Sequence, residues 1–460
     1  MKLSVFGTGY VGLVHGAVLA ASGNNVICVD RDADKIRRLQ GGEIPLHEPG
    51  LGKVVRDAQD RGLLSFTTNA SEAVKHGSVI LIAVGTPGLE DGSADMGPAM
   101  DVADTIGAHI DGHKIVVAKS TLPVGASAKL RLRIAKRLAE RGCEDIPFDV
   151  VANPEFLREG SAVADSTQPD RIIIGTDSEE AIGVLRELYA PFVRSQNDIL
   201  VMDPHSAELT KYAANCMLAT KISFINEIAG IAERLGADID QIRRGIGMDL
   251  RIGHHFINPG VGFGGSCFPK DIQALIRMAD DVGFNPDVLR AVDARNKTQM
   301  LTLFDKARDW FGGSLEGRVF AIWGLAFKPD TDDVRDAPSR VLMEALWSAG
   351  ALVQAYDPAA MQACEAIYGH RENLTLCGTR DAALRGADAL MVVTEWEEFR
   401  TPDLARLRTL LKTPVIFDGR NIYDPDTVAA HGLGYVGVGR QTRRLDQRSD
   451  AHSLSPSGSS

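Results

Sequence analysis

The chain has 460 residues, of which 44% are hydrophobic and 24% are charged, and its formal net charge is −11 at pH 7. This length allows two or three domains, and the acidic balance argues against nucleic acid as the main partner. No apolar run reaches the roughly 18 residues of a membrane-spanning helix, and the N-terminus lacks the pattern of a secretory signal. We therefore expect a cytoplasmic protein.

Residues 1–203 predict a doubly wound α/β domain. Short apolar runs alternate with helix-period segments, and these runs are KLSVFG, NNVICVD, SVILIAVGT, KIVVAKST, FDVVANP and RIIIGT. They are nearly continuous in Val and Ile, as expected of strands that are buried on both faces. The alternation with helices is typical of a parallel sheet.

The pattern changes after residue 203. A stretch that starts near His205 predicts one helix of about thirty residues, a second helix is expected after the Pro-Lys-Asp triplet that ends at Asp271, and a third over roughly 286–311. Residues 204–312 thus predict a central helical segment.

A second alternating block over residues 313–440 predicts another α/β domain, with apolar runs in RVFAIWGLAF, ALVQAYDP, ADALMVVTE and TPVIFDGRN. Residues 441–460 are polar and rich in Ser, which predicts a disordered tail. The expected fold is therefore α/β, with two Rossmann-like doubly wound domains joined by a long central helix.

A dinucleotide-binding pattern opens the chain. Residues 7–12 read GTGYVG, after a predicted strand and before a predicted helix, and Gly7, Gly9 and Gly12 would allow a pyrophosphate to approach the helix N-terminus. The next strand ends at Asp30, whose carboxylate can accept hydrogen bonds from ribose hydroxyls and would repel a 2′-phosphate. This favours NAD over NADP, although Arg31 could accept that phosphate. A glycine turn without a cofactor is the alternative.

The second α/β block carries WGLAFKPDTDDVRDAP at the corresponding place, with one glycine and the cations Lys328 and Arg335. A degenerate loop with cations favours a different phosphate-bearing ligand over a second NAD. Surface charge on a connecting loop is the alternative.

The stretch FGGSCFPKD places Cys267 near the start of a predicted helix, beside Lys270 and Asp271. A helix N-terminus and a nearby lysine both lower the pKa of a thiol. The six cysteines are scattered without a C-x-x-C pair or a metal-ligand spacing, so we expect reduced thiols and no metal site. Cys267 is either a reactive nucleophile or a small apolar residue in a tight turn.

Polar residues on the long helix and at strand ends add to this site. Lys211 and Asn215 are four apart and share one helix face, which is either the solvated face or a face directed into a site. Thr121, Glu155 and Glu159 follow predicted strands, and ligands of doubly wound sheets bind outside the carboxyl ends of strands. Ordinary helix caps are the alternative. These residues indicate a dinucleotide-dependent oxidoreductase in which a cysteine could trap an aldehyde for a second oxidation.

Long, ordered motifs across residues 1 to about 440 resemble the sugar-nucleotide dehydrogenases, that is, the UDP-glucose/GDP-mannose dehydrogenase family. The motifs are FGTGYVGL, STLPVG, NPEFLREGSAVADSTQPDRIIIG, KYAANCMLATKISFINEIA, PGVGFGGSCFPKD, GLAFKPDTDDVRDAPS and GYVGVGR. The resemblance implies oxidation of the primary alcohol of a sugar nucleotide to a carboxylate with two NAD⁺. UDP-glucose is the expected substrate, with GDP-mannose and UDP-N-acetylmannosamine as alternatives. A one-step alcohol dehydrogenase with a structural cysteine and a non-catalytic nucleotide sensor or scaffold are the rival classes.

The resemblance also implies a role for each site residue. Cys267 is the expected nucleophile, Lys211 and Asp271 handle the proton and hold the water, Asn215 stabilises an oxyanion, Thr121 positions the water, and Glu155 or Glu159 assists thioester hydrolysis. The expected NAD contacts are Gly7, Gly9, Tyr10, Val11, Gly12, Asp30, Lys35, Thr86, Thr121, Glu159, Lys270 and Arg335. The expected sugar-nucleotide contacts are Phe156, Leu157, Arg158, Glu159, Lys211, Asn215, Arg251, Phe256, Ile257, Asn258, Pro259, Gly260, Gly264, Lys328 and Arg420.

Two further expectations come from the same resemblance. Members of the family commonly form dimers through the long helix, so we expect a homodimer or higher homo-oligomer in which Arg251 reaches the site of a partner subunit. Phe256 stands where many relatives have a tyrosine, and a phosphate contact from that hydroxyl would be missing in this chain.

Overall fold

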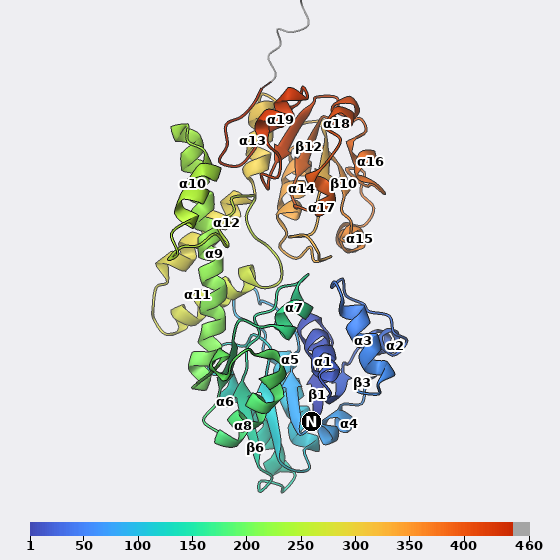
Figure 1. Ribbon diagram of the computed structural model, residues 1–460, viewed down its shortest axis with the longest axis vertical. Helices are drawn as coiled ribbons and strands as arrows, with labels where there is room; N and C mark the ends of the chain where they lie inside the picture. The colour runs from blue at the N-terminus through green and yellow to red at the C-terminus, as the bar shows by residue number, and fades with distance from the viewer. Residues whose placement is uncertain (445–460) are drawn as a thin grey trace, which may run out of the picture. The chain divides into compact units, whose positions relative to one another are not determined.

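The computed structural model describes residues 1–444, and the protein divides into two compact units. The first unit contains residues 1–217 and 267–290, and the second contains residues 218–266 and those from 291 onward. Helix α9 (Pro204–Leu235), the long green helix of Figure 1, begins in the first unit and ends in the second. The residues expected to form a central segment, 204–312, are thus shared between the two units.

The first unit is built on an eight-stranded sheet in the order β3-β2-β1-β4-β5-β6-β7-β8. The pattern in the sequence predicted six of these strands and missed the two at the edges, β3 and β8. The strands are β1 (Lys2–Phe6), β2 (Asn25–Val29), β3 (Leu64–Thr67), β4 (Val79–Ile82), β5 (Lys114–Ala118), β6 (Phe148–Ala152), β7 (Ile172–Gly175) and β8 (Ile199–Met202).

The expectation of an entirely parallel sheet is wrong for one strand pair. Strands β3 to β6 are parallel along the sheet order, but β6 and β7 meet in an antiparallel pair, Ala152 with Gly175. The segment between them holds only the short helix α7 (Ala162–Thr167). A helix of six residues is roughly 9 Å long and cannot carry the chain back along the sheet, as a parallel crossover requires.

Helices cover both faces of this sheet because its strands are apolar on both sides. Alternate residues of the central strands belong to two separate core clusters, so that Val79 and Leu81 face one helical layer while Ile80 and Ile82 face the other. Helices α1 (Tyr10–Ala21), α2 (Ala33–Gln40), α3 (Leu51–Asp60), α7 and α8 (Glu179–Tyr189) pack in the first layer, and α4 (Ala70–His76), α5 (Gly97–His109) and α6 (Ala126–Glu140) pack in the second. The doubly wound expectation is confirmed.

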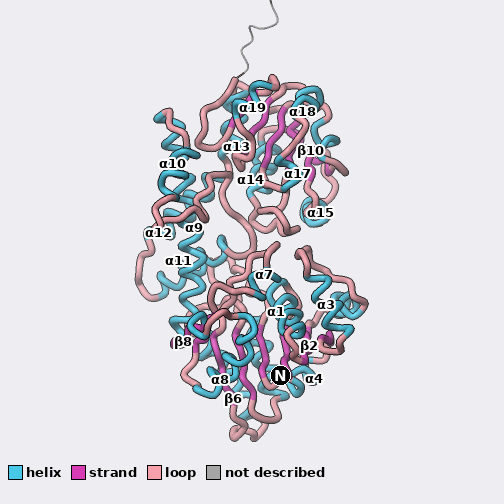
Figure 2. The backbone as a smooth tube through the Cα atoms, in the orientation of Figure 1, coloured by secondary structure: helices cyan, strands magenta, loops and turns pink. Residues whose placement is uncertain are grey.

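The second unit contains a six-stranded parallel sheet in the order β11-β10-β9-β12-β13-β14. The strands are β9 (Val319–Trp323), β10 (Leu352–Tyr356), β11 (Leu374–Leu376), β12 (Ala389–Val392), β13 (Val415–Asp418) and β14 (Gly434–Val436). The helices of this α/β part are α14 (Pro338–Ser348), α15 (Met361–Tyr368), α16 (Arg380–Leu384), α17 (Glu397–Arg400), α18 (Leu404–Leu410) and α19 (Pro425–Ala430). Figure 2 shows the magenta strands of each sheet with cyan helices around them.

Four helices lie between α9 and β9, namely α10 (Ile239–Gly247), α11 (Phe268–Asp281), α12 (Asp287–Gln299) and α13 (Thr302–Trp310). The single helix predicted over roughly 286–311 is therefore wrong, because α12 and α13 are separate. At their junction the Leu301 amide donates to the Thr298 carbonyl three residues back, and this tighter turn ends α12. Residues 287–310 contain no Pro or Gly that would have marked the break.

The end of the described chain is paired with the second sheet. The backbone of Arg443 exchanges two hydrogen bonds of 2.9 Å with that of Tyr435 in β14. The tail was expected to begin at residue 441, and the part from 445 to 460 lies outside the described residues. Within residues 1–444, none of the helices has both the length and the apolar character that crossing a bilayer would require.

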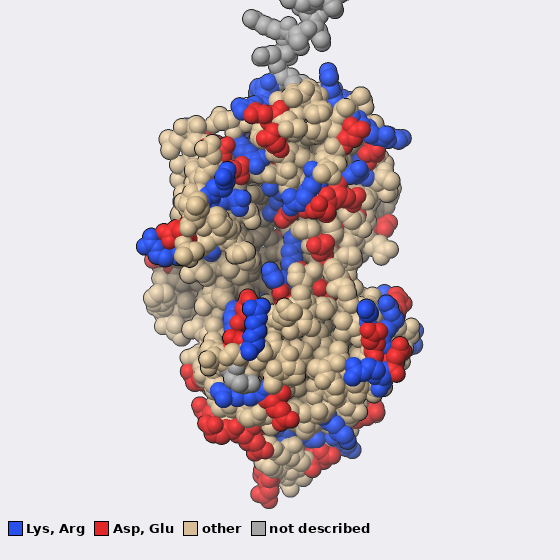
Figure 3. All heavy atoms as spheres, in the orientation of Figure 1, with Lys and Arg blue, Asp and Glu red and all other residues tan. Residues whose placement is uncertain are grey.

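Charge is mixed on the face of the molecule that Figure 3 draws. On the face drawn in Figure 3, Lys and Arg side chains are interspersed with Asp and Glu side chains over both units. Neither sign of charge forms a continuous field on that face.

Candidate active site

The loop between β1 and α1 has the geometry of a pyrophosphate cradle. Gly7 has a φ of 102°, and a Cβ on it would lie 2.5 Å from the carbonyl oxygen of Ala83. A Cβ on Gly12 would lie 2.0 Å from the carbonyl oxygen of Gly7, so both glycines are required for close packing. Gly9, by contrast, has no atom within 4 Å of a Cβ position, and it precedes the first turn of α1. Open space therefore faces the amide groups of this helix N-terminus.

Asp30 follows β2 beside this loop. Its Oδ2 accepts hydrogen bonds from the Thr8 amide at 3.0 Å and the Thr8 hydroxyl at 2.7 Å, and it lies 3.3 Å from the Lys35 Nζ. Partial burial acts to raise the pKa of Asp30, but these hydrogen bonds and the lysine charge hold it below its ordinary value. The side chain keeps 13% of its surface exposed, so an ionised carboxylate remains able to accept ribose hydroxyls. These residues fit an adenine dinucleotide.

Two further expected cofactor residues lie at the adjacent strand ends. The Thr86 hydroxyl, after β4, donates to the Thr121 carbonyl oxygen, after β5, at 3.0 Å. This bond joins the two loops at the carboxyl edge of the sheet, where ligands of doubly wound sheets bind. Lys270 belongs to α11 of the same unit, and a Cβ on Gly88 in the loop after β4 would lie 3.8 Å from its Cγ.

Helix α9 directs Lys211 and Asn215 into the protein and not toward solvent. Lys211 is 3% exposed and Asn215 is 7% exposed, so the solvated-face interpretation is wrong. The Lys211 Nζ forms an ion pair of 3.0 Å with Glu155 Oε1, and the Asn215 amide donates to Asp271 Oδ2 at 2.6 Å. The other oxygen of Asp271 accepts from the Lys270 Nζ at 2.6 Å.

Three negative groups determine the charge of Lys211. Burial alone would lower the pKa of Lys211, but Glu155, Cys267 and Asp271 together raise it above the ordinary lysine value. The site thus holds a permanent ammonium group in a low-dielectric setting, where it acts strongly on developing negative charge. The same interaction places the Cys267 sulfur within the electrostatic reach of that ammonium group.

Cys267 is the residue that precedes α11, and its carbonyl oxygen accepts the Asp271 amide at 2.9 Å. Helix α11 starts at Phe268, two residues before the start near Lys270 that was expected from the sequence. Cys267 is half-buried, whereas burial raises the pKa of Cys28 and of Cys216 to about 12 each. Its place at a helix N-terminus near two lysines favours the thiolate form.

Glu155 and Glu159, four residues apart, have different surroundings. Glu155 is 7% exposed and is held by Lys211 and by the Leu157 amide, which donates to its Oε2 at 2.6 Å. Glu159 is half-buried in the following loop. That loop is anchored by Glu48, whose carboxylate accepts the amides of Gly160 at 2.7 Å and Ala162 at 2.8 Å.

Two cations lie near the ring of Phe156. The guanidinium carbon of Arg171 is 3.6 Å from the ring centroid, and the Lys211 Nζ is 5.4 Å from it. Leu157 and Arg158 follow in the same loop, where Arg158 pairs with Asp165 at 2.6 Å. Phe156 therefore braces Lys211 with its ring.

Several residues that support this site were not expected from the sequence. Glu208, one turn before Lys211 on α9, accepts the amides of Gly125 and Ser127 at 2.6 and 2.8 Å, and so ties the loop after β5 to the helix. Arg171, Glu48 and Asn153 also support the site, and they carry no local signal of their role. For Glu208 the signal was present, because its spacing from Lys211 places both on one helix face.

The second unit contains the other group of expected residues. Phe256 has a φ of 61°, which is rare for an aromatic residue. Gly260 is held by Asn226 and Gln299, with the Asn226 oxygen accepting its amide at 2.8 Å and the Gln299 amide donating to its carbonyl oxygen at 2.6 Å. A Cβ on Gly264 would lie 2.1 Å from the Asp336 carbonyl oxygen. The glycine-rich run is therefore packed tightly within this unit. Ile257 and Pro259 lie in the same run, and Asn258 accepts a hydrogen bond from Arg243 at 2.6 Å.

Arg420 joins three loops of the second unit. Its guanidinium donates to the carbonyl oxygens of Val393 at 2.7 Å, Gly262 at 3.3 Å and Phe327 at 3.2 Å. It also pairs with Glu395 at 3.1 Å. The loop that carries Lys328 and the loop that carries Gly260 are thereby held by one side chain.

The remaining two arginines expected to bind ligands are both exposed, and each pairs with a nearby aspartate. Arg335 forms two bonds of 2.8 Å to the carboxylate of Asp333. The side chain of Arg251 is 89% exposed and pairs with Asp249, so within the described residues it points into solvent.

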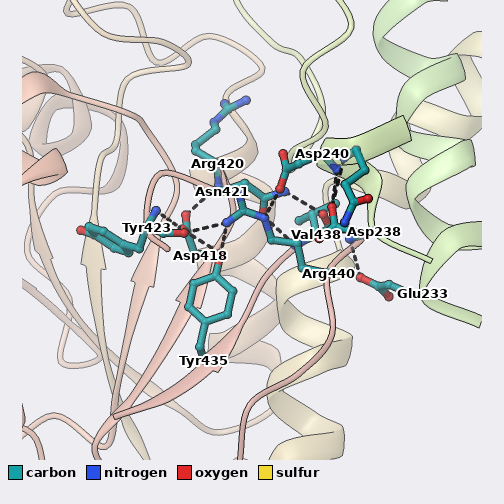
Figure 4. A network of polar contacts seen from close by, with 12 residues as sticks. Glu233, Asp238, Asp240, Asp418, Arg420, Asn421, Tyr423, Tyr435, Val438 and Arg440 are labelled. Carbon is teal, nitrogen blue, oxygen red and sulfur yellow. Dashed lines mark hydrogen bonds and ion pairs between the residues drawn. The ribbon is translucent and has the colours of Figure 1, made fainter. Parts of the chain in front are cut away.

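Figure 4 shows the polar contacts of the GYVGVGR motif, residues 434–440, within this unit. Arg440 donates to Asp240 of α10, to the Tyr423 carbonyl oxygen at 2.7 Å and to the Tyr435 hydroxyl at 2.7 Å. The Tyr435 hydroxyl in turn donates to Asp418 at 3.1 Å. The network joins α10 to strands β13 and β14, and this accounts for the GYVGVGR motif in structural terms.

Comparison with known proteins supplies independent findings. Three family models of the UDP-glucose/GDP-mannose dehydrogenase family match the chain: the NAD binding domain over residues 1–193, the central domain over 205–298 and the UDP binding domain over 321–425. A UDP-glucose 6-dehydrogenase of Pseudomonas aeruginosa is 49% identical over 443 residues, covering 96% of this chain and 98% of that protein.

Two further relatives agree. A UDP-glucose 6-dehydrogenase of Bacillus subtilis is 43% identical over 451 residues, covering 98% of this chain and 96% of the relative. The solved structure of a UDP-glucose dehydrogenase from Pyrobaculum islandicum superposes with a TM-score of 0.86 at 37% identity, covering 95% of this chain and 98% of that one.

Proposed function

We infer that this chain, which belongs to the UDP-glucose/GDP-mannose dehydrogenase family, oxidises UDP-glucose to UDP-glucuronate with two NAD⁺. The observation that carries the inference is the buried group around Cys267, in which Lys211, Asn215 and Asp271 are connected in pairs with Glu155 and Lys270. A one-step alcohol dehydrogenase would need a base but no cysteine beside it.

NAD would be held by the first unit. The amides at the start of α1 would donate to the pyrophosphate, Asp30 would accept hydrogen bonds from the adenosine ribose hydroxyls, and Lys35 would donate to the same ribose. The family resemblance implies further NAD contacts at Tyr10, Val11, Thr86, Thr121, Glu159, Lys270 and Arg335. When bound, NAD supplies a hydride acceptor for each of the two oxidations.

The residues of this chain supply the rest of the chemistry. Of the two residues expected to handle the proton, Asp271 accepts the proton of the primary alcohol as it becomes an aldehyde, and the charged Lys211 donates a hydrogen bond to the alcohol oxygen. The Cys267 thiolate then adds to the aldehyde carbon, forming a C–S bond, and loss of a second hydride turns this thiohemiacetal into a thioester. Asn215 and the Lys211 ammonium stabilise the oxyanion in both additions.

Hydrolysis ends the cycle. Water held by Asp271 and Thr121 attacks the thioester carbon with help from Glu155 or Glu159, the C–S bond breaks, and Cys267 leaves as the thiolate while the product leaves as a carboxylate. The substrate contacts proposed for the sugar nucleotide are Phe156, Leu157, Arg158, Glu159, Lys211, Asn215, Arg251, Phe256, Ile257, Asn258, Pro259, Gly260, Gly264, Lys328 and Arg420.

The stoichiometry of NADH tests this proposal. With limiting UDP-glucose taken to exhaustion, we expect two NADH per UDP-glucose and little NADH from GDP-mannose in parallel. One NADH per UDP-glucose would mean that the reaction stops at the aldehyde, and no NADH would remove UDP-glucose as the substrate.

A matched pair of cysteine variants tests the covalent step. Cys267→Ser should lower steady turnover about a thousandfold or more, because the protonated serine hydroxyl is a weaker nucleophile at neutral pH and its alkoxide is a poorer leaving group. Cys143→Ser is the control, since Cys143 is the other half-buried cysteine. Unchanged formation of acid by Cys267→Ser would contradict the thioester route.

We also propose a cytoplasmic homodimer formed through α9. Apolar side chains at heptad-like spacing are exposed along this helix, with Met217 62% exposed, Phe224 55% exposed and Ile231 46% exposed. An exposed stripe of this kind is typical of a helix that packs on a partner. Phe224→Glu should convert the dimer to a monomer in light scattering, whereas Leu132→Glu on α6, where the residue is 71% exposed, should not. A dimer that survives Phe224→Glu would contradict this surface.

A further inference from the structure

Lys119, the residue that follows β5, is buried and has no role in the mechanism above. The residue is 4% exposed. An ammonium group in such a place loses its hydration, which is costly unless a carboxylate compensates for it. A buried lysine without a carboxylate partner is therefore a candidate for a side chain that gains or loses its proton during function.

The partners of Lys119 are neutral. Its Nζ donates to Asn153 Oδ1 at 3.0 Å and lies 5.5 Å from the ring centroid of Tyr189. The Asn153 oxygen also accepts the Tyr189 hydroxyl at 2.6 Å, and the Asn153 amide donates to the Ile173 carbonyl oxygen at 2.6 Å. Within residues 1–444, no carboxylate lies at ion-pair distance from this Nζ. The amine is thus held in one position by a buried amide.

Charged and titratable groups face Lys119 from every element around it. They are His15 of α1, Glu155 after β6, Tyr189 of α8 and Lys211 of α9. Burial lowers the pKa of Lys119 most strongly, Glu155 raises it and Lys211 lowers it, and the result is a pKa of about 7. Burial and Lys119 also hold the pKa of His15 well below its ordinary value, so His15 stays neutral.

Glu155 therefore has two amines near it and forms an ion pair with only one. Lys211 has the pair, at 3.0 Å, and its charge is maintained by Cys267 and Asp271 as well. When Lys119 is neutral, Glu155 remains with Lys211. When Lys119 is charged, it attracts Glu155 and repels the Lys211 ammonium group, and both effects weaken that pair.

We propose that Lys119 is a positioning residue that controls the Lys211–Glu155 pair, leaving it intact as a neutral amine and weakening it as an ammonium ion. The inference rests on the function proposed above, in which Lys211 stabilises the oxyanion. It predicts that turnover rises with pH as Lys119 loses its proton, in addition to any titration of Cys267.

Two variants fix Lys119 in either charge state. Lys119→Met removes the charge, and Lys119→Arg keeps it at every working pH, because the guanidinium group does not lose its proton. Lys114→Met is the matched control. Lys114 is a buried lysine at the opposite end of β5, where its Nζ donates to the Lys75 carbonyl oxygen at 3.2 Å.

The test is the pH profile of kcat for NADH formation from UDP-glucose, between about pH 6 and about pH 8. A group with a pKa near 7 is neutral in about one molecule in ten at pH 6, so the fall in kcat should be about tenfold smaller in Lys119→Met than in the wild type. Lys119→Arg should have a kcat about tenfold lower at pH 8 with a KM for UDP-glucose within about twofold. Lys114→Met should keep the wild-type profile.

The same fall in kcat for Lys119→Met and the wild type would overturn the proposal. If Lys119→Met does not fold, Lys119→Gln is the second neutral variant, and a wild-type profile without an inflection near pH 7 overturns the proposal by itself.

Thermal unfolding separates this inference from the proposed function. Because the folded pKa of Lys119 lies below that of an unfolded lysine, the unfolded chain binds more protons between about pH 7 and pH 10, and stability rises with pH in that window. Tm should therefore rise less steeply with pH in Lys119→Met than in the wild type or in Lys114→Met. An unchanged slope would overturn the inference, whereas the absence of NADH from the wild type would overturn only the substrate assignment.

Discussion

Six strands of the first sheet have the same topology as the whole second sheet, but the space beside the first loop differs between the two. Their strand orders, β3-β2-β1-β4-β5-β6 and β11-β10-β9-β12-β13-β14, are equivalent strand by strand. Gly7 after β1 and Gly324 after β9 have φ values of 102° and 99°. A Cβ on Gly7 would meet Ala83 after β4, and one on Gly324 would meet Thr394 after β12.

An aspartate follows β2 in the first sheet and β10 in the second, and the two aspartates differ in their hydrogen-bond partners and exposure. Asp30 Oδ2 accepts from the amide and hydroxyl of Thr8 and from Lys35, but within residues 1–444 its Oδ1 accepts only from the Asp32 amide, and 13% of the side chain stays exposed. Asp357 is 1% exposed, and its two oxygens accept from five donors. These donors are the amides of Leu325, Ala326, Ala359 and Ala360 and the indole nitrogen of Trp396.

A carboxylate at the same topological position can therefore bind a ligand in one domain and accept hydrogen bonds from the protein itself in another. Asp30 has acceptor capacity left for ribose hydroxyls, whereas the capacity of Asp357 is consumed by the protein. The second Rossmann-like sheet therefore has no ribose-binding acid at this place, in keeping with the match of residues 321–425 to a UDP binding domain.

The largest effect, on stability, is expected at Asp357, whose two carboxylate oxygens accept five hydrogen bonds. Asp357→Ala would leave five buried donors without their acceptor and should lower the free energy of unfolding of the second unit by roughly 3–5 kcal/mol. Tryptophan fluorescence during denaturant unfolding measures this selectively, because all four tryptophans, at 310, 323, 347 and 396, lie in the second unit. A change in the free energy of unfolding below about 1 kcal/mol would show that these hydrogen bonds to Asp357 do not stabilise the second unit.

A smaller effect, on binding and not on folding, is expected at Gly9. Its φ of −77° and ψ of −169° suit any residue, and a Cβ there meets no atom. Gly9→Val should therefore leave Tm nearly unchanged and raise the KM for NAD about a hundredfold by filling the space for the pyrophosphate. Gly183→Val on α8, where a Cβ also meets no atom, is the control. An unaltered KM for NAD in Gly9→Val would place the cofactor elsewhere.

The smallest of the three effects is expected at Asp30. Asp30→Ala should raise the KM for NAD about tenfold to thirtyfold and bring the KM for NADP closer to it, because the charge that repels a 2′-phosphate is gone. Asp32→Ala is the control, since Asp32 caps α2 with two hydrogen bonds of 3.0 Å and should affect only stability, by about 1 kcal/mol. If Asp30→Ala lost stability as Asp357→Ala should, the two aspartates would be equivalent and the comparison would fail.

Much of the fold could be predicted because the central strands carry their own signal. The VILI run of β4 is buried on both faces, and near-continuous apolar runs of this length are typical of strands in parallel sheets. The edge strands were missed because they lack this signal. Strand β8 exposes Leu200 and Val201 by 45% and 38%, and β14 has three residues within a glycine-rich motif.

The candidate site was predictable to the extent that its residues lie in short motifs. The loop of Gly7 to Gly12, Asp30 and the Cys267 segment are local patterns with a physical reason for each residue. The alternative for Lys211 and Asn215, a solvated helix face, could be excluded only by their burial. No local pattern marks Arg171, Glu48 or Asn153, because their roles depend on partners that are distant in the chain.

The sequence by itself determined the two Rossmann-like blocks, the long helix, the dinucleotide loop and the family, since these depend on periodicity and on contiguous motifs. Only the tertiary structure decided which of two equivalent aspartates keeps a free acceptor, and that Lys119 is buried against an amide and not a carboxylate. The reason is that hydrogen-bond saturation and desolvation are properties of everything that surrounds a group, and those neighbours come from segments that no single stretch of sequence brings together.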